Sequence, residues 1–321
     1  MKRSKLTKIL LGATLPALLA FGAINSATAQ TNIVFVAPVT VKVNRTSTTY
    51  AQIFSMNANG GGVVQLTSAN VSASCPRWSP GQKYIAFNRN GTLYVMKANG
   101  GGTFAVAPAS VGGCDWSPDG TKLVYEGPMP GDNLYIVSVD AATGRVGAPV
   151  LFQSGEYSNP SWSPDGTRIA FWGSEVGSEP FWIYVCDVAT GAEISCFGVS
   201  DPAAAPGFSN ETPQWSPDGS LIAFSGPVTW VTTEGVTNTA NEIFTANADG
   251  TGITRQTFLE SYTLFPTWSP DGTAIAFRSD VSGRPSVYKM VLGRSPAKNK
   301  ITLLYSDGNA PDWNPSNPVW P

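Results

Sequence analysis

Side chains that carry the common enzyme chemistries are scarce in this chain of 321 residues. The sequence contains no histidine, which removes the commonest general base, the Ser-His and Cys-His nucleophile pairs and the usual zinc ligands. It has no Gly-x-Ser-x-Gly segment and no phosphate-binding loop, because no helix pattern follows the glycine runs at 60–62 and 100–102. We therefore expect no catalytic residues and no cofactor.

Carboxylates alone could still support a hydrolase or a lyase. Glu175 and Glu179 are the one close pair in a segment expected to be a loop. They stand four residues apart among Gly and Ser residues, where both side chains are expected to face solvent. A carboxylate-dependent enzyme is therefore kept as an alternative, without an assigned catalytic residue.

One carboxylate recurs inside a repeated motif, which reads Trp-Ser-Pro-Asp-Gly in its complete form. Pro followed by Asp and Gly is typical of a tight turn, in which Pro sets φ and Asp bonds nearby backbone. Two copies lack the Asp, at Gln82 and Ser316, which suits a structural turn better than a shared active site. We interpret the Asp as a turn residue and the Trp as a wedge between repeats. The six copies begin at Trp78, Trp116, Trp162, Trp215, Trp268 and Trp313.

The spacing of these motifs, 38 to 53 residues, is that of a four-stranded propeller blade rather than a two-helix repeat. A short apolar run follows each turn, as in 84–87 and 275–277, and predicts a strand covered on both faces. A second run, a Gly turn such as Asn99-Gly100 and a third run complete each unit. With the strand that carries Trp, each repeat therefore contains four strands.

The two ends of the chain combine into one further repeat. Residues 32–35, 53–56 and 63–66 have the pattern of the second, third and fourth strands of a blade, and residues 310–313 supply its first strand. We therefore predict an all-β fold, a six-bladed β-propeller of four-stranded antiparallel blades. Its ring is closed by the C-terminal strand, which completes the N-terminal blade and protects sheet edges.

Residues 1–29 have the pattern of a secretory signal peptide. Basic residues precede an apolar stretch at 9–24, and Ala27-Thr28-Ala29 matches an Ala-x-Ala cleavage site. Residues 30–321 then form a single propeller domain. We expect an exported protein, periplasmic or secreted, with no membrane insertion after cleavage.

Charge limits the classes of partner. The signal segment holds 4 of the 20 basic residues, so 16 basic residues remain against 22 acidic ones, a net charge of −6. This balance argues against nucleic acid or an anionic membrane surface as a partner. We expect a monomer that binds a protein or peptide of the cell envelope.

The repeats resemble a known family. Trp-Ser-Pro-Asp-Gly, then Ile-Ala-Phe, then the segment 243–250 closed by Arg255-Gln256-Thr257 is similar to the WD40-like PD40 repeats of TolB proteins. The resemblance covers essentially all of the chain after the signal segment and implies a six-bladed propeller that binds a protein partner. TolB proteins also carry an N-terminal α/β domain, whereas strand-like sequence begins here at Asn32. Docking through that domain is therefore not implied.

Connection lengths differ between the two faces of the expected ring. Turns from first to second strands and from third to fourth strands are mostly short, whereas the other connections share the opposite face and hold nearly every insertion. Long loops on a rigid scaffold are where recognition usually occurs, and aromatic residues serve as anchors. We predict a binding surface on this long-loop face, although single aromatic side chains could instead cover the blades. Its expected residues are Tyr50, Tyr157, Phe208, Trp230, Tyr262, Phe265 and Arg284.

The residue before each Trp should lie near the axis of the propeller. Trp78 belongs to the repeat between those of Trp313 and Trp116, so Arg77 is expected between Asp312 and Asp115. We predict an ion-pair cluster there and favour a structural role over ligand or cation binding. Two carboxylates hold Ca²⁺ only with further oxygen donors, so no metal is expected.

Four cysteines in an exported chain allow three disulfide pairings. Cys186 and Cys196 flank a hairpin turn at 189–192, so they should face each other across neighbouring strands. Cys75 and Cys114 shortly precede the Trp of adjacent repeats, near the axis. We predict disulfides between Cys75 and Cys114 and between Cys186 and Cys196, as an oxidising compartment favours.

Two functional hypotheses follow from the sequence. The first is an exported propeller without chemistry of its own, which binds a protein or peptide on the long-loop face. The second is a propeller that binds a glycan or another small ligand there, with a carboxylate-dependent hydrolase or lyase as its catalytic form. A pull-down from the cell envelope, compared with a glycan array, would separate them.

Overall fold

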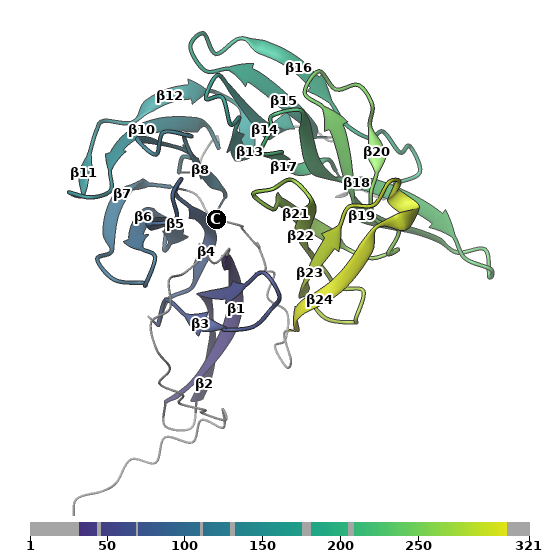
Figure 1. Cartoon of the computed structure of the whole chain (residues 1–321), viewed down its shortest axis with the longest axis horizontal. Coiled ribbons are helices and arrows are strands. Elements are labelled where there is room, and N and C mark those ends of the chain that lie inside the picture. Colours follow the sequence, from purple (N-terminus) through teal and green to yellow (C-terminus); the bar gives the residue numbers. More distant parts are fainter. Residues whose placement is uncertain are drawn as a thin grey trace, which may run out of the picture. The chain divides into compact units, whose positions relative to one another are not determined.

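The computed structural model describes residues 32–43, 46–68, 70–109, 112–128, 132–174, 181–204 and 209–306. These ranges fold almost entirely into β-strands, with one short 3-10 helix, η1 (Pro296–Lys298). The strands form antiparallel sheets that follow one another around a central axis (Figure 1). The predicted all-β class and six-bladed propeller are confirmed.

Each blade is a sheet whose strands neighbour one another in chain order, except that β11 and β12 of blade 3 both pair with β10. Blades 1 and 2 contain β1 (Asn32–Val43), β2 (Thr46–Asn57) and β3 (Val64–Gln65), then β4 (Ala73–Trp78), β5 (Tyr84–Arg89), β6 (Thr92–Lys97) and β7 (Phe104–Pro108). Blades 3 and 4 contain β8 (Cys114–Trp116), β9 (Lys122–Glu126), β10 (Leu134–Asp140), β11 (Arg145–Val146) and β12 (Val150–Gln153), then β13 (Glu156–Trp162), β14 (Arg168–Ser174), β15 (Trp182–Asp187) and β16 (Glu193–Phe197). Blades 5 and 6 contain β17 (Glu211–Trp215), β18 (Leu221–Val231), β19 (Thr237–Asn247) and β20 (Thr254–Arg255), then β21 (Thr263–Trp268), β22 (Ala274–Ser279), β23 (Ser286–Val291) and β24 (Lys300–Ser306).

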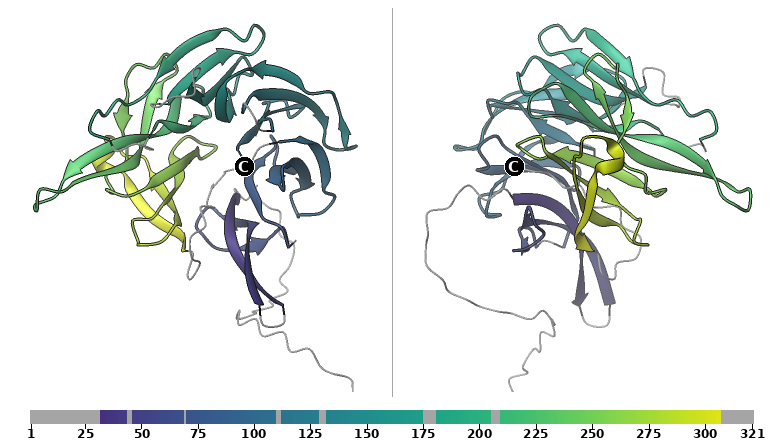
Figure 2. Two further views of the ribbon diagram at one scale, coloured as in Figure 1. Left: turned by 180° about the vertical axis from the view of Figure 1, so that it is seen from behind. Right: turned by 45° about the vertical axis from the view of Figure 1, so that its right-hand side comes forward.

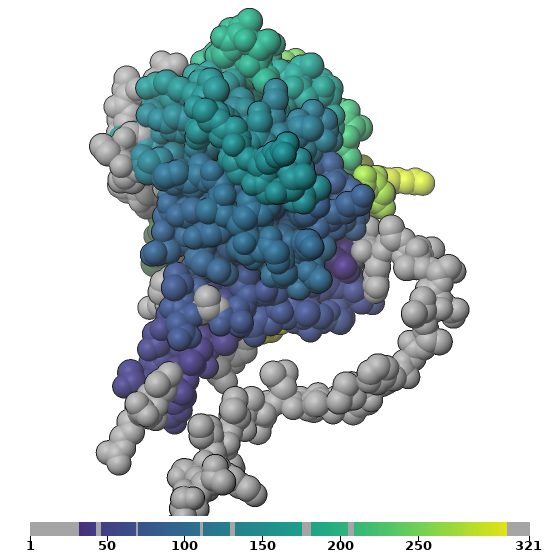
Figure 3. Space-filling view, turned by 90° about the vertical axis from the view of Figure 1, so that its left-hand side faces the viewer, coloured from purple at the N-terminus to yellow at the C-terminus, as the bar shows by residue number. Residues whose placement is uncertain are grey.

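The blades lie in chain order around the axis. In the space-filling view the outer edges of successive blades follow one another from the first to the fourth (Figure 3). Two hairpins, β1–β2 and β18–β19, are longer than the others and extend beyond the rest of the sheets (Figure 2). Both are connections between second and third strands, so they belong to the long-loop face.

Blade 1 packs directly against blade 6. The ring centroids of Phe35 and Tyr305 lie 4.6 Å apart, and Ile33 and Phe35 share a core cluster with Ala276 and Val287. Apolar packing between the first and the last blade therefore closes the ring within the described residues. The C-terminal strand expected at 310–313 lies outside the described residues, as does the signal segment at 1–29.

The second strand of each blade carries the apolar run and is buried on both faces. The phenylalanine that ends this run is at most 1% exposed in five blades. Each sheet is covered by the sheets before and after it, which requires apolar side chains on both of its faces. The five residues are Phe35, Phe87, Phe171, Phe224 and Phe277.

The repeated Asp stabilises the turn between first and second strands, as predicted. In blade 6, Asp271 Oδ1 accepts hydrogen bonds from the Ser269 hydroxyl at 2.6 Å and from the backbone N–H of Thr273 at 3.0 Å. The Ser269 hydroxyl oxygen in turn accepts the N–H of Ala274 at 2.9 Å. Gly272 follows with φ of +68°, a conformation that a residue with a Cβ adopts only at a cost. The same arrangement recurs at Asp119, Asp165 and Asp218.

Replacing Asp271 by Ala should destabilise the protein by about 1 kcal/mol, the usual cost of losing a side-chain oxygen that accepts a backbone N–H bond. The Ser269 hydroxyl, and then the N–H and hydroxyl of Thr273, lower the pKa of Asp271 to about 2. Because this pKa lies below its unfolded value, the contribution is present above about pH 4 and is lost as the pH falls toward about 2. Urea unfolding of the wild type and of Asp271→Ala between about pH 6 and about pH 2 measures this difference in the free energy of unfolding.

Asp271→Asn is the matched control for this loss. It keeps one acceptor oxygen but cannot ionise, so it should lose less stability than Asp271→Ala, and that loss should not depend on pH in the same way. An Asp271→Ala protein as stable as the wild type at about pH 6 would contradict the assigned role of the carboxylate.

Candidate functional site

An axial pocket of about 410 Å³ opens where the innermost strands end in the Pro turns. Arg77 and Asp115, both predicted for the channel, lie in this pocket. The third predicted residue, Asp312, lies outside the described residues. Gln214, Ser216 and Thr267 also line it, and the rest of the wall is made by tryptophans and prolines of the repeated motif. These are Trp78, Trp116, Trp162, Trp215 and Trp268, with Pro80, Pro118, Pro164, Pro217 and Pro270.

The recurring Trp joins neighbouring blades, as predicted. Trp78, on β4, packs in one core cluster with Val34 and Ile53 of blade 1. Trp116 Nε1 donates a hydrogen bond to the Arg77 carbonyl of the preceding blade at 3.3 Å. Trp268 Nε1 does the same with the carbonyl of Gln214 at 3.2 Å. At these two joints, Arg77 and Gln214, each the residue before a Trp, contribute their backbone carbonyls to the contact between blades.

Asp115 contributes its side chain to such a joint. Its Oδ1 accepts the N–H of Trp116 at 3.0 Å, and its Oδ2 accepts the N–H of Trp162, on the next blade, at 2.8 Å. Arg77 Nε donates to the carbonyl of Cys114 at 3.1 Å instead of to this carboxylate. Within the described part of the chain Arg77 and Asp115 form no ion pair, so the expected cluster is reduced to two charges in one pocket.

The innermost strands carry backbone strain at equivalent positions. Cys75, Asn159, Thr212 and Phe265 have φ between +48° and +57°, and each directly precedes a proline. Each lies at an irregularity in the pairing with the second strand. A left-handed non-glycine residue costs about 1–2 kcal/mol, and such strain is concentrated at functional sites. Phe265, predicted for the long-loop surface, thus lies on an innermost strand and is partly buried.

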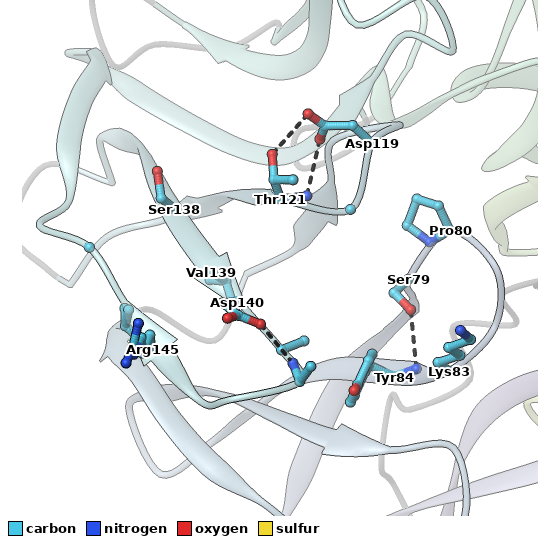
Figure 4. Close-up of a pocket in the computed structure, with 15 residues that line it drawn as sticks. Ser79, Pro80, Lys83, Tyr84, Asp119, Thr121, Ser138, Val139, Asp140 and Arg145 are labelled. Carbon is cyan, nitrogen blue, oxygen red and sulfur yellow. Dashed lines mark hydrogen bonds between the residues drawn. The ribbon is translucent and has the colours of Figure 1, made fainter.

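A second pocket, of about 590 Å³, lies between blades 2 and 3 on the face of the short turns. Figure 4 shows that its carboxylates are bonded to their own turns. Asp119 accepts bonds from Thr121, and Asp140 accepts the N–H of Ala142 at 3.1 Å. The Ser117 hydroxyl is the largest cause that lowers the pKa of Asp119, and the Thr143 hydroxyl is the largest that lowers the pKa of Asp140. Neither is therefore suited to act as a general acid near neutral pH.

A third hollow, here called the long-loop groove, has a volume of about 500 Å³ and lies between blades 5 and 6. It brings together Trp230 and Tyr262, two residues predicted for the binding surface. Both side chains are partly exposed, and Trp230 also packs against the core cluster of blades 4 and 5. The remaining lining residues are Asn238, Thr239, Ala240, Leu259, Glu260, Ser261, Asp280, Val281 and Gly283.

The loop that forms one wall of the groove is held by Glu242, a fully buried residue on β19. Its Oε1 accepts the backbone N–H groups of Leu259 at 2.6 Å and Glu260 at 2.7 Å. Its Oε2 accepts the hydroxyl of Thr257. Arg255 forms an ion pair with Oε1 at 3.3 Å. A buried charge with this many partners stabilises one loop conformation, because breaking it would leave the carboxylate uncompensated.

Sequence patterns did not reveal Glu242 as a positioning residue. In blade 1, Gln52 and Thr67 occupy the positions of Glu242 and Thr257, and the same pair of positions recurs in the sequence. The hydroxyl of Thr67 donates to Gln52 Oε1 at 2.7 Å. The hydroxyl oxygens of Thr67 and Thr257 also accept the N–H of the residue that follows the buried acceptor. This residue is Ile53 in blade 1 and Ile243 in blade 5. The Thr that closes these two repeats therefore predicts a buried acceptor fifteen residues earlier.

Asp280 and Arg278 complete the surroundings of Tyr262. Asp280 Oδ1 accepts the N–H of Tyr262 at 2.9 Å and the hydroxyl of Ser261. The Arg278 guanidinium lies 5.7 Å from the centre of the Tyr262 ring. Arg278 is 6% exposed, and within the described residues its Nε and Nη1 have no hydrogen-bond partner. Burial lowers the pKa of Arg278 and raises that of Tyr262.

The other residues predicted for the long-loop surface are not gathered in this groove. Tyr157 is 5% exposed, and its ring lies 4.8 Å from that of Phe171, so it belongs to the core of blade 4. Tyr50 is partly exposed on the β1–β2 hairpin, and Arg284 is exposed in the turn before β23. Phe208 lies outside the described residues, as do Glu175 and Glu179.

Neither predicted disulfide is present in the structure. Cys186 and Cys196 do not face each other, because the strand register pairs Cys196 with Tyr184, and beyond a bulge Cys186 pairs with Glu193. Cys75 and Cys114 lie on neighbouring innermost strands and influence each other electrostatically without being joined. Burial is the largest cause that raises the pKa of both thiols.

Among the described residues no group of three or more Cys, Asp and Glu side chains could hold a metal ion. Over the same ranges no helix has the length and apolarity needed to cross a membrane.

The carboxyl of Asp115 should titrate far from its ordinary range. Burial raises its pKa to about 6, while the charge of Arg77 and the two backbone donors act in the opposite direction. Its ionisation therefore costs stability, since the favourable contribution is present below about pH 4 and is lost as the pH rises through about 6. Carbon-detected NMR titration should give a midpoint near 6 in the wild type and a higher one in Arg77→Gln. Midpoints near 4 in both proteins would contradict this.

Known proteins share this architecture. A family model described as the PD40 TolB beta propeller domain matches residues 158–318, half of the chain. The Tol-Pal system protein TolB of Alcanivorax borkumensis is 33% identical over 94 residues, which cover 29% of this chain and 21% of that protein. The chain thus matches about a fifth of the length of this curated relative.

Solved structures agree on the fold. TolB from Acinetobacter baumannii superposes with a TM-score of 0.63 at 18% identity, covering 90% of this chain and 66% of the other. A TolB-type protein of Agrobacterium tumefaciens gives a TM-score of 0.60 at 20% identity, covering 86% and 89%. At these identities the likeness supports the fold, and the family model supplies the membership. The chain belongs to the PD40 family of TolB beta-propeller domains.

Proposed function

We propose that this protein is an exported propeller that binds a protein or peptide of the cell envelope on its long-loop face. The observation that carries the proposal is the long-loop groove, in which Trp230 and Tyr262 line a preformed hollow. Partly exposed aromatic side chains in such a hollow are the usual anchors of protein recognition. Membership of the TolB propeller family supports a binding role, and the curated relative is named as part of the Tol-Pal system.

We further propose that the protein has no chemistry of its own. The chain has no histidine. The carboxylates of the pocket between blades 2 and 3 are engaged in their turns, and Glu242 is engaged in holding a loop. Asp119 and Asp140 therefore stabilise their turns and Glu242 stabilises a loop. These structural roles favour binding over catalysis.

Export is part of the same proposal. The basic and apolar segments of residues 1–29 and the Ala-x-Ala site before Gln30 support removal of a signal peptide and release into the periplasm or beyond.

A glycan in the long-loop groove is the second candidate function. It is favoured by the aromatic rings of Trp230 and Tyr262, which line the groove beside Ser261 and Asp280. The Asp280 carboxylate accepts hydrogen bonds from sugar hydroxyls, and the Ser261 hydroxyl donates or accepts them.

Trp230→Ala should weaken capture of the envelope partner at least tenfold, because truncating a central aromatic anchor costs about 2 kcal/mol or more. Its side chain is partly exposed, so the melting temperature should fall by no more than about 4 °C. Residues 30–321 of wild type and variant would be used for pull-down from the cell envelope, and the same material would be applied to a glycan array.

Phe258→Ala is the matched control, because Phe258 is 58% exposed near the groove without lining it. Capture by this variant should equal that of the wild type. A large loss of melting temperature in Trp230→Ala would instead assign Trp230 to the core. Binding to glycans with no captured protein would favour the second candidate.

A further inference from the structure

Charge is distributed unevenly between the two faces of the propeller. The connections of the long-loop face and the strand ends beside them, over the described residues, contain seven exposed or partly buried carboxylates but four such cations, Lys42, Arg89, Arg255 and Arg284. On the opposite face the carboxylates are bonded within their turns and lie among basic residues such as Lys83 and Lys122. The long-loop carboxylates are Asp132, Glu156, Asp201, Glu211, Glu234, Glu260 and Asp280.

We propose that the long-loop groove receives a lysine or arginine side chain from a basic segment of the protein partner. The proposal rests on the proposed function and specifies the chemistry of the partner. Two carboxylates, Glu260 and Asp280, line the groove beside Trp230 and Tyr262. A cationic side chain between them gains Coulomb attraction from the carboxylates and cation–π attraction from the rings.

The groove is organised for this role before any partner arrives. Glu242 fixes the backbone at Leu259 and Glu260, so the wall that carries the Glu260 carboxylate is held from a buried anchor. Asp280 holds the backbone of Tyr262 through Oδ1, so its Oδ2 takes no part in that bond and remains an acceptor for a ligand. A preformed site loses less conformational entropy when the ligand binds, which increases its affinity.

Among the described residues two cations lie near the groove, and neither lines it. Arg255 is paired with Glu242 behind the wall, and the position of Arg278 limits its influence. Its guanidinium lies against the ring of Tyr262, but Arg278 is not among the lining residues. Its Nε and Nη1 have almost no accessible surface. An acidic ligand in the groove would therefore meet the carboxylates of Glu260 and Asp280 without reaching these donors. The charges that face the hollow favour a cation.

The test uses fluorescently labelled peptides with residues 30–321 of the protein. An alternating Lys-Gly peptide is compared with its lysine-acetylated form and with an alternating Glu-Gly peptide by fluorescence anisotropy. We expect the lysine peptide to bind, salt to weaken it, and the other two peptides to bind at least tenfold more weakly. Glu260→Gln should weaken the lysine peptide about fivefold, as expected for one partly exposed ion pair of about 1 kcal/mol.

Glu156→Gln is the matched control, because it removes an exposed carboxylate from the same face outside the groove. It should change the affinity by less than about twofold. Equal weakening by Glu156→Gln and Glu260→Gln would overturn the proposal, because it would show a diffuse attraction to the face. Preferential binding of the Glu-Gly peptide, lost in Arg278→Gln, would overturn it in favour of an acidic ligand.

Failure of this proposal is distinguishable from failure of the proposed function. If the envelope partner is captured and Trp230→Ala abolishes capture, but Glu260→Gln has no effect, the face binds a protein by another chemistry and the basic segment is excluded. If the lysine peptide binds in the groove and no envelope protein is captured, the groove has the proposed chemistry and the cellular role is wrong.

Discussion

The structure depends on one repeated interaction, the packing of each blade's apolar face against the next blade. The buried phenylalanine of the second strand and the tryptophan at the end of the first strand occupy this contact. Since every sheet is covered on both faces, neither face is left for a ligand. Recognition must therefore use the two ends of the strands or the axis, and the insertions select the long-loop end.

The fold was predictable because its determinants are local and repeated. A motif such as Trp-Ser-Pro-Asp-Gly specifies a turn through bonds between residues two apart, as at Ser269 and Asp271, so sequence spacing is enough to locate it. The surface residues were predicted less well, because exposure depends on the neighbouring blade. Tyr157 and Trp230 are both aromatic and both lie toward the long-loop face, yet Tyr157 packs under Phe171 and Tyr184. No pattern within either loop distinguishes them.

The cysteines illustrate a second limit. Whether Cys186 and Cys196 face each other depends on strand register, which pairs Cys196 with Tyr184, two residues before Cys186. The turn type and the loop length set the register of a hairpin, and the hairpin sequence alone does not reveal it. Glu242 was missed for a related reason, since its partners come from a loop thirteen to eighteen residues further along the chain.

The carboxylates of this protein divide by the donors that surround them. Those in the short turns accept hydrogen bonds from residues two positions away, which lowers their pKa and commits them to the backbone. Carboxylates such as Glu260 and Glu156 lie on the long-loop face, where insertions rather than the repeat determine the sequence. The carboxylates of the short turns stay ionised, but their oxygens are engaged by their own turns, whereas Glu260 and Glu156 are not part of the repeated turn. A partner that uses electrostatic attraction to find this protein would meet the long-loop face first.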